Sequence, residues 1–380
     1  MKNKSLYIFA PSVSRTDGGI PSVAYYMATY FKQNCKVKCY SVLESNEKIE
    51  GVDVYYPNTT NLLLKTLRNK KRFLKDCRQD EEGKLIICMS WRYALVAYFT
   101  AAKMGIPYVV MTHGNDILSS SKKRKSLKEK AEEKLRKKIL EKADCICSIS
   151  EYTREKVSRI VPGREIILIH PCSGEPVKTI EEIGAAQTKG TDVKSGRYIL
   201  SVGRLEARKG NILVVEAMAS LHAKYPDLKY YIAGKGPYEN AIRSRIKELN
   251  LEDTCIMLGR VSEEKKKELL DGCSIFAMPS FIIENEKSVE GFGIVYIEAN
   301  AHGKPVIASK SGGVPDAVID GKTGVLAGEK NVCEIAKAID DIISGNLIIS
   351  AEDCLKWANK HYYMNIMREY DNLFESIIEK

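Results

Sequence analysis

Two successive runs of alternating strands and helices constrain the fold of this chain more than any other feature. Short apolar or β-branched segments alternate with longer stretches of helical periodicity. The predicted strands are 5-SLYIFA-10, 35-CKVKCYSVL-43, 83-GKLIICMS-90, 107-PYVVMTHG-114, 144-DCICSIS-150 and 165-EIILIHP-171 in the first series, and 197-RYILSVG-203, 229-KYYIAGKG-236, 255-CIMLGR-260, 273-CSIFAMPS-280 and 304-KPVIASKSGG-313 in the second. Predicted helices of the second series include 210-GNILVVEAMASLHAKY-225, 238-YENAIRSRIKELN-250 and 262-SEEKKKELLDG-272. Alternation of this kind produces βαβ units and therefore parallel sheets. Because 380 residues exceed the size of one ordinary core, we expect two doubly wound α/β domains in tandem.

A non-periodic stretch separates the two series. Residues 173–195 are rich in Gly, Thr and Ser, and they divide an N-terminal domain, 1–172, from a C-terminal domain, 196–354. The last segment, 355–380, has helical periodicity and is expected to pack back on the N-terminal domain. Ligands of doubly wound sheets bind beyond the carboxyl ends of the strands, so the loops that follow strands are where a site is expected.

Composition and cysteine usage exclude several classes of protein. The hydrophobic content of 44% and charged content of 28% are those of a globular protein, and no apolar run is long enough to span a bilayer. No signal-peptide pattern opens the chain. The eleven cysteines lack CxxC or Cys/His metal spacing and fall mainly in apolar runs. They are interpreted as small buried hydrophobes in a reducing cytosol.

Several loops after predicted strands combine glycine with basic residues. They are 15-RTDGGIP-21, 202-VGRLEARKGN-211, 233-AGKGP-237 and 290-EGFGIV-295. Glycine permits close approach of the backbone, and N–H groups at a helix start favour an anion. Arg204 and Lys209, five residues apart, could therefore clamp a diphosphate from two sides. The alternative is that both are surface charges, as most lysines and arginines are.

Two nucleotide-binding motifs are absent. A dinucleotide site requires GxGxxG after a strand, and the nearest candidate, 234-GKGPYE-239, has Glu239 in place of the third glycine. No GxxxxGK[ST] occurs either, which excludes the P-loop NTPases.

Two carboxylates, Glu290 and Glu298, lie eight residues apart in 289-VEGFGIVYIEANAHGKPVIAS-309. Glu298 interrupts a run that otherwise indicates a buried helix, where a charge needs a partner. It could bind a ligand, cap a helix or pair with a neighbouring lysine. Glu290 could equally be a solvated loop charge. His113, after the strand 107–112, could be either functional or a satisfied core histidine.

The segments 201-SVGRLEARKG-210, 233-AGKGP-237, the stretch 290–309 with its E-x7-E spacing, 311-SGGVPDAVIDGKTG-324 and 17-DGGIP-21 together resemble the retaining GT-B glycosyltransferases of family 4. The resemblance covers nearly the whole chain and is tightest over residues 198–326. It implies two Rossmann-like domains that face each other across a cleft, the second of which binds a nucleotide sugar.

The resemblance also implies a role for each candidate residue. Glu298 would bind the ribose hydroxyls, and Glu290 would bind a hydroxyl of the donor sugar. Arg204 and Lys209 would neutralise the diphosphate and stabilise the leaving group as the anomeric bond breaks. His113 would lie near the reacting face of the sugar. The other expected donor contacts, mostly through the main chain, are Gly18, Gly19, Val261, Gly291, Phe292, Gly293, Ile294 and Val295.

The implied chemistry requires charge stabilisation at a leaving diphosphate more than a protein nucleophile. The substrate would be a UDP- or GDP-sugar that supplies a hexosyl or N-acetylhexosaminyl group. No metal ion or other cofactor is expected, because Arg204 and Lys209 can supply the positive charge. The same architecture also occurs in nucleotide-sugar 2-epimerases, and loss of catalysis would leave a nucleotide-sugar-binding protein; both remain alternatives.

The positive charge of the chain is concentrated in its first half. Residues 1–172 contain 32 Lys and Arg against 18 Asp and Glu, whereas the chain as a whole has a net charge of +10. Most of this excess falls in 62–78 and 122–142, which have the pattern of basic amphipathic helices attracted to anionic lipid. A solvated face with Glu/Lys pairs is the alternative for 122–142.

No nucleic-acid-binding module accompanies these segments, so nucleic acid is not expected as a partner. The expected partners are instead a nucleotide sugar, a lipid-linked or polysaccharide acceptor, and an anionic membrane surface. The sequence therefore predicts a peripheral enzyme of polysaccharide or glycolipid synthesis at the cytoplasmic face of the cell membrane.

Overall fold

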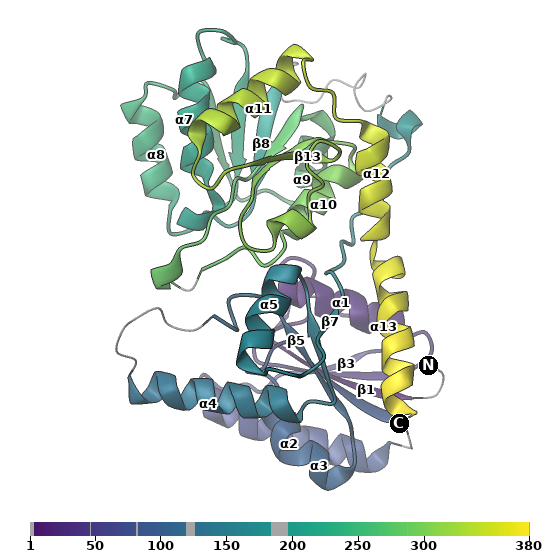
Figure 1. The fold of residues 1–380 in the computed structure, drawn as a ribbon. Helices are drawn as coiled ribbons and strands as arrows, with labels where there is room; N and C mark the ends of the chain where they lie inside the picture. The colour runs from purple at the N-terminus through teal and green to yellow at the C-terminus, as the bar shows by residue number, and fades with distance from the viewer. Residues whose placement is uncertain are drawn as a thin grey trace. The chain divides into compact units, whose positions relative to one another are not determined.

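The chain forms two compact units in a computed structural model that describes residues 4–45, 47–80, 83–118, 126–183, 197–286 and 288–379 (Figure 1). Unit 1 consists of Met1–Gly174 together with Tyr363–Lys380, and unit 2 is Glu175–Tyr362. These boundaries differ from those expected from the sequence, because 355–362 belongs to unit 2. Residues 184–195 of the expected linker lie outside the described residues.

Unit 1 contains a parallel sheet of seven strands in the order β3-β2-β1-β4-β5-β6-β7. Strands β1 and β4 pair with each other near the middle of this sheet, and β1 is buried along its whole length. Strands buried on both faces are typical of a sheet covered by helices on each side. The strands are β1 Ser5–Ala10, β2 Lys36–Ser41, β3 Asp53–Tyr55, β4 Lys84–Cys88, β5 Tyr108–Thr112, β6 Cys145–Ser148 and β7 Ile167–Leu168.

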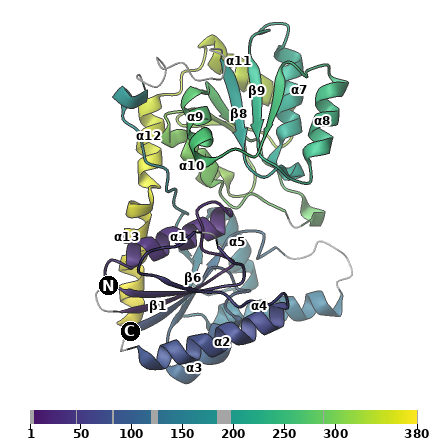
Figure 2. The same ribbon diagram turned by 180° about the vertical axis from the view of Figure 1, so that it is seen from behind.

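Helices cover both faces of this sheet. Two views show α2, α3 and α4 on one face, and α1 and α5 on the other (Figures 1 and 2). The helices are α1 Gly19–Phe31, α2 Leu62–Gln79, α3 Leu95–Met104, α4 Leu127–Lys142, α5 Glu151–Ile160 and α13 Tyr363–Ile378.

Unit 2 repeats the same plan with six parallel strands in the order β10-β9-β8-β11-β12-β13. From β8 the chain adds strands β9 and β10 on one side of the sheet, and it then adds β11, β12 and β13 on the other side. The pair β8 and β11 is therefore the topological switch point, where ligands of such sheets bind. The strands are β8 Tyr198–Val202, β9 Lys229–Ala233, β10 Cys255–Gly259, β11 Ile275–Ala277, β12 Val306–Ser309 and β13 Gly324–Ala327.

The helices of unit 2 alternate with its strands, except that β12 is followed only by a short 3-10 turn and that α12 follows α11 directly. Three of them, α7, α8 and α9, confirm helices predicted from the sequence. They are α7 Asn211–Leu221, α8 Glu239–Glu248, α9 Glu263–Gly272, α10 Ile294–Ala301, α11 Val332–Ser344 and α12 Ala351–Lys360, with short 3-10 turns η1 Ala207–Lys209, η2 Glu284–Glu286 and η3 Val314–Asp316. Among the described residues, no helix is both long and apolar enough to cross a membrane.

The C-terminal segment is not one helix. Helix α12 ends at Lys360 in unit 2, and α13 begins at Tyr363 in unit 1. The break falls at His361, which is buried between the rings of Phe292 and Trp357 at centroid distances of 5.5 and 4.5 Å. Neither proline nor glycine is present at the break.

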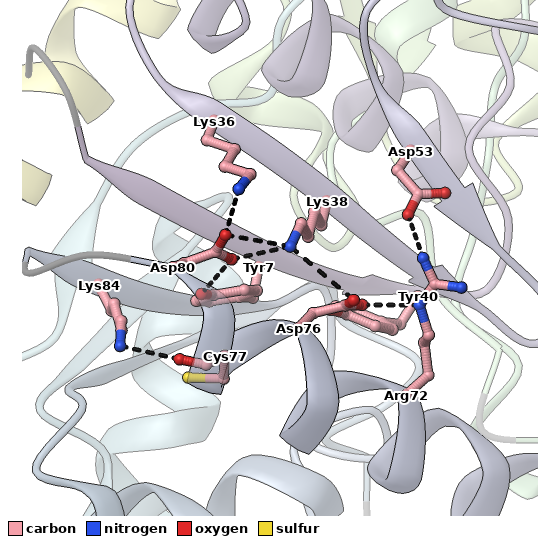
Figure 3. Close-up of polar contacts among 10 residues, drawn as sticks. All are labelled: Tyr7, Lys36, Lys38, Tyr40, Asp53, Arg72, Asp76, Cys77, Asp80 and Lys84. Atoms are coloured by element: carbon pink, nitrogen blue, oxygen red, sulfur yellow. Dashed lines mark hydrogen bonds and ion pairs between the residues drawn. The ribbon is translucent and has the colours of Figure 1, made fainter.

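A buried polar network ties the C-terminal end of α2 to the sheet of unit 1 (Figure 3). Tyr7 of β1 donates a hydrogen bond to Asp80 Oδ2 at 2.7 Å, and Lys38 Nζ of β2 lies 2.9 Å from the same oxygen. One turn earlier, Asp76 accepts a hydrogen bond from Tyr40 of β2 at 2.9 Å. Buried carboxylates persist only with such partners, so this network fixes the position of α2.

The helix predicted over 62–78 is present as α2, but its apolar residues do not form one exposed face. Leu63 and Leu67 are exposed, with 68% and 52% of their surface accessible. Phe73 is fully buried in the core and Leu74 packs against it. The apolar residues of 62–78 therefore divide into an exposed N-terminal group and a buried C-terminal group.

A buried histidine joins the beginning of unit 2 to helices α9 and α10. His302, directly after α10, places Nδ1 2.6 Å from Asp271 of α9 and Nε2 3.3 Å from Glu175. Lys178 pairs with the same Asp271, and Lys267 lies 3.4 Å from Glu175. The side chain of His302 is fully buried, so these two carboxylates hold the first residues of unit 2 in place.

Candidate active site

The glycine-bearing loops of unit 2 pack directly against one another at the carboxyl edge of the sheet. A Cβ atom added to Gly234 would lie 1.8 Å from the carbonyl oxygen of Gly203, and one on Gly236 would lie 2.2 Å from that of Leu205. The N–H of Leu205 donates to the carbonyl of Lys235 at 3.0 Å. The glycines of 233–237 are thus required by the approach of the loops after β8 and β9.

A second close approach brings the loops after β8 and β11 together at the switch point. A Cβ on Gly210 would lie 2.2 Å from the carbonyl oxygen of Pro279. The N–H of Phe281 donates to the carbonyl of Arg208 at 2.9 Å. The segment that follows β11 is therefore held against η1, and it carries Glu290 toward the basic residues of 204–209.

Five charged side chains form a continuous chain of alternating sign at this place. Arg204 Nε lies 3.3 Å from Glu206 Oε1, and Glu206 Oε2 lies 3.1 Å from Arg208 Nε. Arg208 then donates to Glu290 Oε2 at 2.6 Å, and Lys209 Nζ donates to the same oxygen at 2.5 Å. Three of the predicted residues, Arg204, Lys209 and Glu290, are thus brought together by two that the sequence analysis did not select.

Exposure differs along this chain of charges. The side chain of Arg204 is 72% exposed, whereas those of Arg208, Lys209 and Glu290 are only 12–13% exposed. Burial acts to raise the pKa of Glu290, but the positive charges of Lys209 and Arg208 outweigh it and lower this pKa to about 2. Glu290 is therefore a partly buried carboxylate that stays ionised, and the alternative of a solvated loop charge is wrong.

The main chain around Glu290 is held by the loop after β12. The N–H of Gly313 donates to the carbonyl of Glu290 at 2.9 Å, and a Cβ on Gly312 would lie 2.6 Å from that oxygen. Directly after Glu290 the chain turns into α10 through Gly293, which has a φ of 96°. The φ value explains the glycine, since this conformation is costly for other residues.

The expected donor-contact segment 291–295 comprises the turn before α10 and the first two residues of that helix. Gly291 and Gly293 are buried, and Ile294 and Val295 are partly buried. The ring of Phe292 is buried against His361, so its side chain belongs to the core. Any contact of Phe292 with a ligand is left to its main chain, as the sequence analysis expects.

Glu298 lies one helical turn further along α10 and forms a separate ion pair. Its Oε2 is 3.5 Å from Nζ of Lys266 on α9, and its side chain is 21% exposed. Lys266 also lies 2.8 Å from Glu263. The pairing with a lysine, one alternative from the sequence, is therefore present. Val261 is half-buried in the loop between β10 and α9, next to Ser262, which caps α9.

The predicted residues of unit 1 lie at the carboxyl edge of its own sheet. Gly18 has a φ of 116° and precedes α1, whose first residue is Gly19. His113 follows β5, and its N–H donates to Asp116 Oδ1 at 2.9 Å. Burial lowers the pKa of the His113 imidazole to about 4, against an opposing hydrogen bond to the main chain of Met89. The ring is therefore neutral at physiological pH.

His113 retains one unsatisfied polar atom. Its Nε2 is buried and has no hydrogen-bond partner among the residues that the structure describes. A buried ring nitrogen without a partner is costly in a core, so the alternative of a fully satisfied core histidine is wrong. Among the residues that the structure describes, no three His, Cys, Asp or Glu side chains gather as metal ligands.

Arg208 is the residue that the sequence analysis missed. Its signal was present in 204-RLEARK-209, where arginine and glutamate alternate at positions 204, 206 and 208. Such alternation is also common on solvated surfaces. Only the approach of the loop after β11 shows that the guanidinium of Arg208 is buried and bonded to Glu290.

Two parallel, doubly wound units with a basic site at the switch point of the second define the GT-B class of protein. The structure of Anabaena HepE in complex with UDP and glucose has this fold. It matches with a TM-score of 0.75 at 17% identity, over 98% of this chain and 99% of the other. At that identity the likeness concerns the fold alone.

Family comparisons agree over both units. A family model described as Glycosyltransferase Family 4 matches residues 17–172, and one described as Glycosyl transferases group 1 matches residues 186–362. Together they span most of the chain. The chain belongs to family 4 of the GT-B glycosyltransferases.

Two characterised relatives are mannosyltransferases. A GDP-mannose-dependent alpha-(1-6)-phosphatidylinositol monomannoside mannosyltransferase of Mycolicibacterium smegmatis is 28% identical over 212 residues, which is 53% of each chain. A GDP-mannose-dependent monoacylated alpha-(1-6)-phosphatidylinositol monomannoside mannosyltransferase of Corynebacterium glutamicum is 31% identical over 254 residues, 64% of this chain and 63% of the relative. The chain thus matches less than two thirds of the length of these relatives.

Proposed function

We propose that this protein is a retaining glycosyltransferase that moves a hexosyl or N-acetylhexosaminyl group from a UDP- or GDP-sugar to a lipid-linked or polysaccharide acceptor. The observation that carries the proposal is the chain of charges from Arg204 to Lys209 at the switch point of unit 2. A site with more cations than carboxylates, at the edge where such sheets bind ligands, suits a nucleoside diphosphate.

Each donor group has a candidate partner in unit 2. Arg204, with its exposed guanidinium, and Lys209 bind the diphosphate, while Glu290 binds a hydroxyl of the sugar. Glu298 leaves Lys266 or shares it to bind the ribose hydroxyls, and Val261 contacts the base through its main chain. The main-chain N–H groups at the start of α10 also bind the diphosphate, because a helix start favours an anion.

The chemistry depends on the leaving group. As the anomeric C–O bond breaks, its electron pair remains on the diphosphate oxygen, and positive charge develops on the sugar ring. The cations stabilise the departing diphosphate, which makes the bond easier to break. The acceptor hydroxyl then attacks the same face of the sugar, and its proton passes to the leaving diphosphate. No metal ion is required by this scheme, since Arg204 and Lys209 supply the positive charge.

Unit 1 contributes the acceptor side in this proposal. As the family resemblance implies, we propose that Gly18 and Gly19 contact the donor phosphate through their main chain and that His113 contacts the sugar. The exposed apolar residues of α2 support a lipid-linked acceptor. Helix α2 begins at the carboxyl edge of the sheet, because helices of doubly wound folds start where the preceding strand ends. This is the edge that also carries His113.

The chemistry of the exposed end of α2 suits an anionic membrane surface. Leu62, Leu63 and Leu67 are 65%, 68% and 52% exposed. Arg68 and Lys71 are exposed beside them. Apolar side chains fringed by cations bind the interface of an anionic bilayer. We therefore infer that 62–78 contacts the cytoplasmic face of the cell membrane, where a nucleotide sugar is available.

The second basic segment gives weaker support. Leu127 at the start of α4 is 85% exposed, but Lys137 pairs with Glu141 at 3.6 Å and Arg92 with Glu132 at 2.8 Å. Ion pairs of this type are typical of a solvated helix face. Residues 122–125 of this segment lie outside the described residues. We include 122–142 as an accessory contact.

The donor is tested by thermal shift against a panel of nucleotide sugars that includes GDP-mannose and UDP-glucose, because a bound ligand raises the unfolding temperature by mass action. The positive donor is then incubated with a membrane extract, and NMR identifies the product and its anomeric configuration. Transfer with retention supports the proposal. Epimerised donor without transfer identifies a 2-epimerase, and binding without any turnover identifies an inactive binding protein.

The membrane contact is tested by flotation with vesicles that contain phosphatidylglycerol and with vesicles of phosphatidylcholine alone. We expect the wild type to float with the anionic vesicles, and Leu63→Ser with Leu67→Ser to reduce this fraction. Ile348→Ser is the matched control, because Ile348 is 82% exposed but lies in unit 2. Failure of the wild type to float with either vesicle contradicts the membrane contact and leaves the glycosyltransferase proposal standing.

A further inference from the structure

Two cations share a single oxygen of Glu290. Arg208 Nη1 and Lys209 Nζ bond Oε2 at 2.6 and 2.5 Å, whereas Oε1 accepts no hydrogen bond from the residues that the structure describes. The side chains of all three residues are 12–13% exposed. One oxygen of this carboxylate is therefore fixed and doubly neutralised, and the other is available to a ligand.

The ammonium group of Lys209 has two competing anionic partners, Glu290 and the donor diphosphate. In the proposed function it binds the donor diphosphate, but in the structure it is bonded to Glu290. If Lys209 were the only counterion, its movement to the diphosphate would leave a nearly buried carboxylate without a partner. A buried charge that loses its partner is strongly unfavourable, so donor binding would be opposed by the very residue that binds the sugar.

Arg208 remains as a counterion of Glu290 when Lys209 moves away, because its own bond to the carboxylate does not involve Lys209. Its guanidinium bonds Glu290 on one side and lies 3.1 Å from Glu206 on the other. Its carbonyl accepts the N–H of Phe281 at 2.9 Å, which fixes its main chain. Lys209, in contrast, has no second acidic partner within the described part of the chain. Of the two cations, Lys209 is the one that can move.

We propose that Arg208 is a positioning residue that neutralises and holds Glu290 while Lys209 moves to the diphosphate of the donor. The inference rests on the proposed function, since it concerns the same donor site. Arg208 acts through Glu290 and does not itself contact the donor. The carboxylate remains in place, with Oε1 free for the sugar hydroxyl, in both positions of Lys209.

A double-mutant cycle tests this inference with UDP and GDP as the probes. Calorimetry measures their affinity for the wild type, Arg208→Gln, Glu290→Gln and the double variant. Neither probe carries a sugar, so the contact of Glu290 with the sugar does not enter. We expect Arg208→Gln to weaken binding about 30-fold, or about 2 kcal/mol at 1.4 kcal/mol per factor of ten, because Lys209 must then stay with Glu290.

The distinguishing result is the effect of Arg208→Gln in the Glu290→Gln background. Once the carboxylate is neutral, Lys209 is free without Arg208, so the second substitution should change the affinity by less than about threefold. Glu290→Gln alone should bind the diphosphate at least as tightly as the wild type. If Arg208 contacts the diphosphate directly, its removal weakens binding equally in both backgrounds, and the inference is overturned.

The pH dependence gives a readout that a purely structural role would not produce. Among the described residues, three charged or titratable groups face Glu290: Arg208 and Lys209 from η1 and Tyr296 from α10. Without Arg208, protonation of Glu290 releases Lys209, so lowering the pH should restore the affinity of Arg208→Gln relative to the wild type. Arg208→Lys should bind UDP and GDP more tightly than Arg208→Gln at every pH, because lysine can still pair with Glu290.

Two controls keep the outcomes separate. The unfolding midpoint of every variant is measured, and the cycle is read as a ratio of affinities among variants that remain folded. Lys209→Ala should weaken binding of the probe in all backgrounds. If the wild type binds neither UDP nor GDP, the proposed function fails together with the inference. If the wild type binds but the cycle shows no coupling, only the role of Arg208 is wrong.

Discussion

Replacement of Asp80 by asparagine should strongly destabilise unit 1. The side chain of Asp80 is fully buried and accepts bonds from Tyr7 at 2.7 Å and from Lys38 at 2.9 and 3.2 Å, with Lys36 as a further partner. Asparagine preserves the shape but removes the negative charge. Among the described residues, Asp76, at 3.8 Å, would then be the remaining carboxylate partner of the nearly buried ammonium of Lys38.

The structure sets the size of the effect. Removal of one partner from a buried ion pair costs about 3–5 kcal/mol. Because Lys38 retains its contact with Asp76, we expect Asp80→Asn to lower the free energy of unfolding by about 3 kcal/mol, the lower end of this range. For a unit of about this size each kcal/mol lowers the melting temperature by about 2–4 °C. We therefore expect a decrease of about 6–12 °C, measured by calorimetry together with urea unfolding.

The pH dependence of this variant follows from the same contacts. Burial acts to raise the pKa of Asp80, but the hydrogen bonds from Lys36, Lys38 and Tyr7 outweigh it, and the pKa is lowered. A carboxyl with a lowered pKa stabilises the fold above its unfolded value of about 3.9. It loses this contribution as the pH falls through the folded-state pKa. The difference between wild type and variant should therefore be constant near neutral pH and shrink below about pH 4.

The matched control is Asp53→Asn in the same network. Asp53 pairs with Arg72 at 2.6 Å, but its side chain is 48% exposed, and exposed pairs contribute less than about 1 kcal/mol. If the two variants unfold at the same urea concentration, burial does not decide the strength of these pairs, and the reasoning is refuted.

Three further predictions concern unit 2. Glu298→Gln should weaken binding of UDP or GDP about tenfold, the low end for loss of a hydrogen bond to a charged group; calorimetry with an unchanged affinity would exclude its ribose contact. Gly234→Ala should destabilise unit 2 by about 2 kcal/mol or more in urea unfolding, because its Cβ would overlap a neighbouring carbonyl. Gly321→Ala, where nothing lies within 4 Å, should cost about 1 kcal/mol. Burial acts to lower the pKa of His302, but its two carboxylate partners outweigh it and the pKa is raised. The stability that the charged His302 gives to unit 2 should therefore be full below about pH 6.5 and be lost as the pH rises through the folded-state pKa. His302→Asn should abolish this dependence of the unfolding free energy on pH.

Most strands could be predicted from the sequence because each is an apolar run with loop residues at both ends. The segment 5–10 is β1 itself, and the second half of the chain yields β8 to β12 in the predicted order. The sequence analysis missed β3 and β13. Strand β3 has only three residues, Asp53–Tyr55, none of them buried. A segment so short has no periodicity to detect, and its pairing with β2 defines it.

Three of the five charged residues of the candidate site could be predicted from the sequence, but the bonds between them could not. Arg204, Lys209 and Glu290 converge because loops after neighbouring parallel strands meet at one edge of a sheet. Which cation binds which carboxylate depends on close approaches between loops, and a sequence does not give those distances. Arg208 and Glu298 are two residues whose partners the sequence did not identify. Arg208 has a buried bond that its sequence context did not indicate, and Glu298 has a lysine partner on another helix.

The separation of unit 1 into two stretches of chain has a consequence for its synthesis. Helix α13 fills the core of unit 1 after all of unit 2 has been translated; its buried side chains are Ile366, Met367, Tyr370, Phe374 and Ile377. The ring of Phe374 packs 5.5 Å from that of Phe31 on α1. On the ribosome, unit 2 is contiguous and can mature first, whereas the apolar surface of α1 stays uncovered until α13 emerges. A nonsense codon shortly before Tyr363 would therefore spare the inserted unit and leave the flanking one unfinished and prone to aggregate.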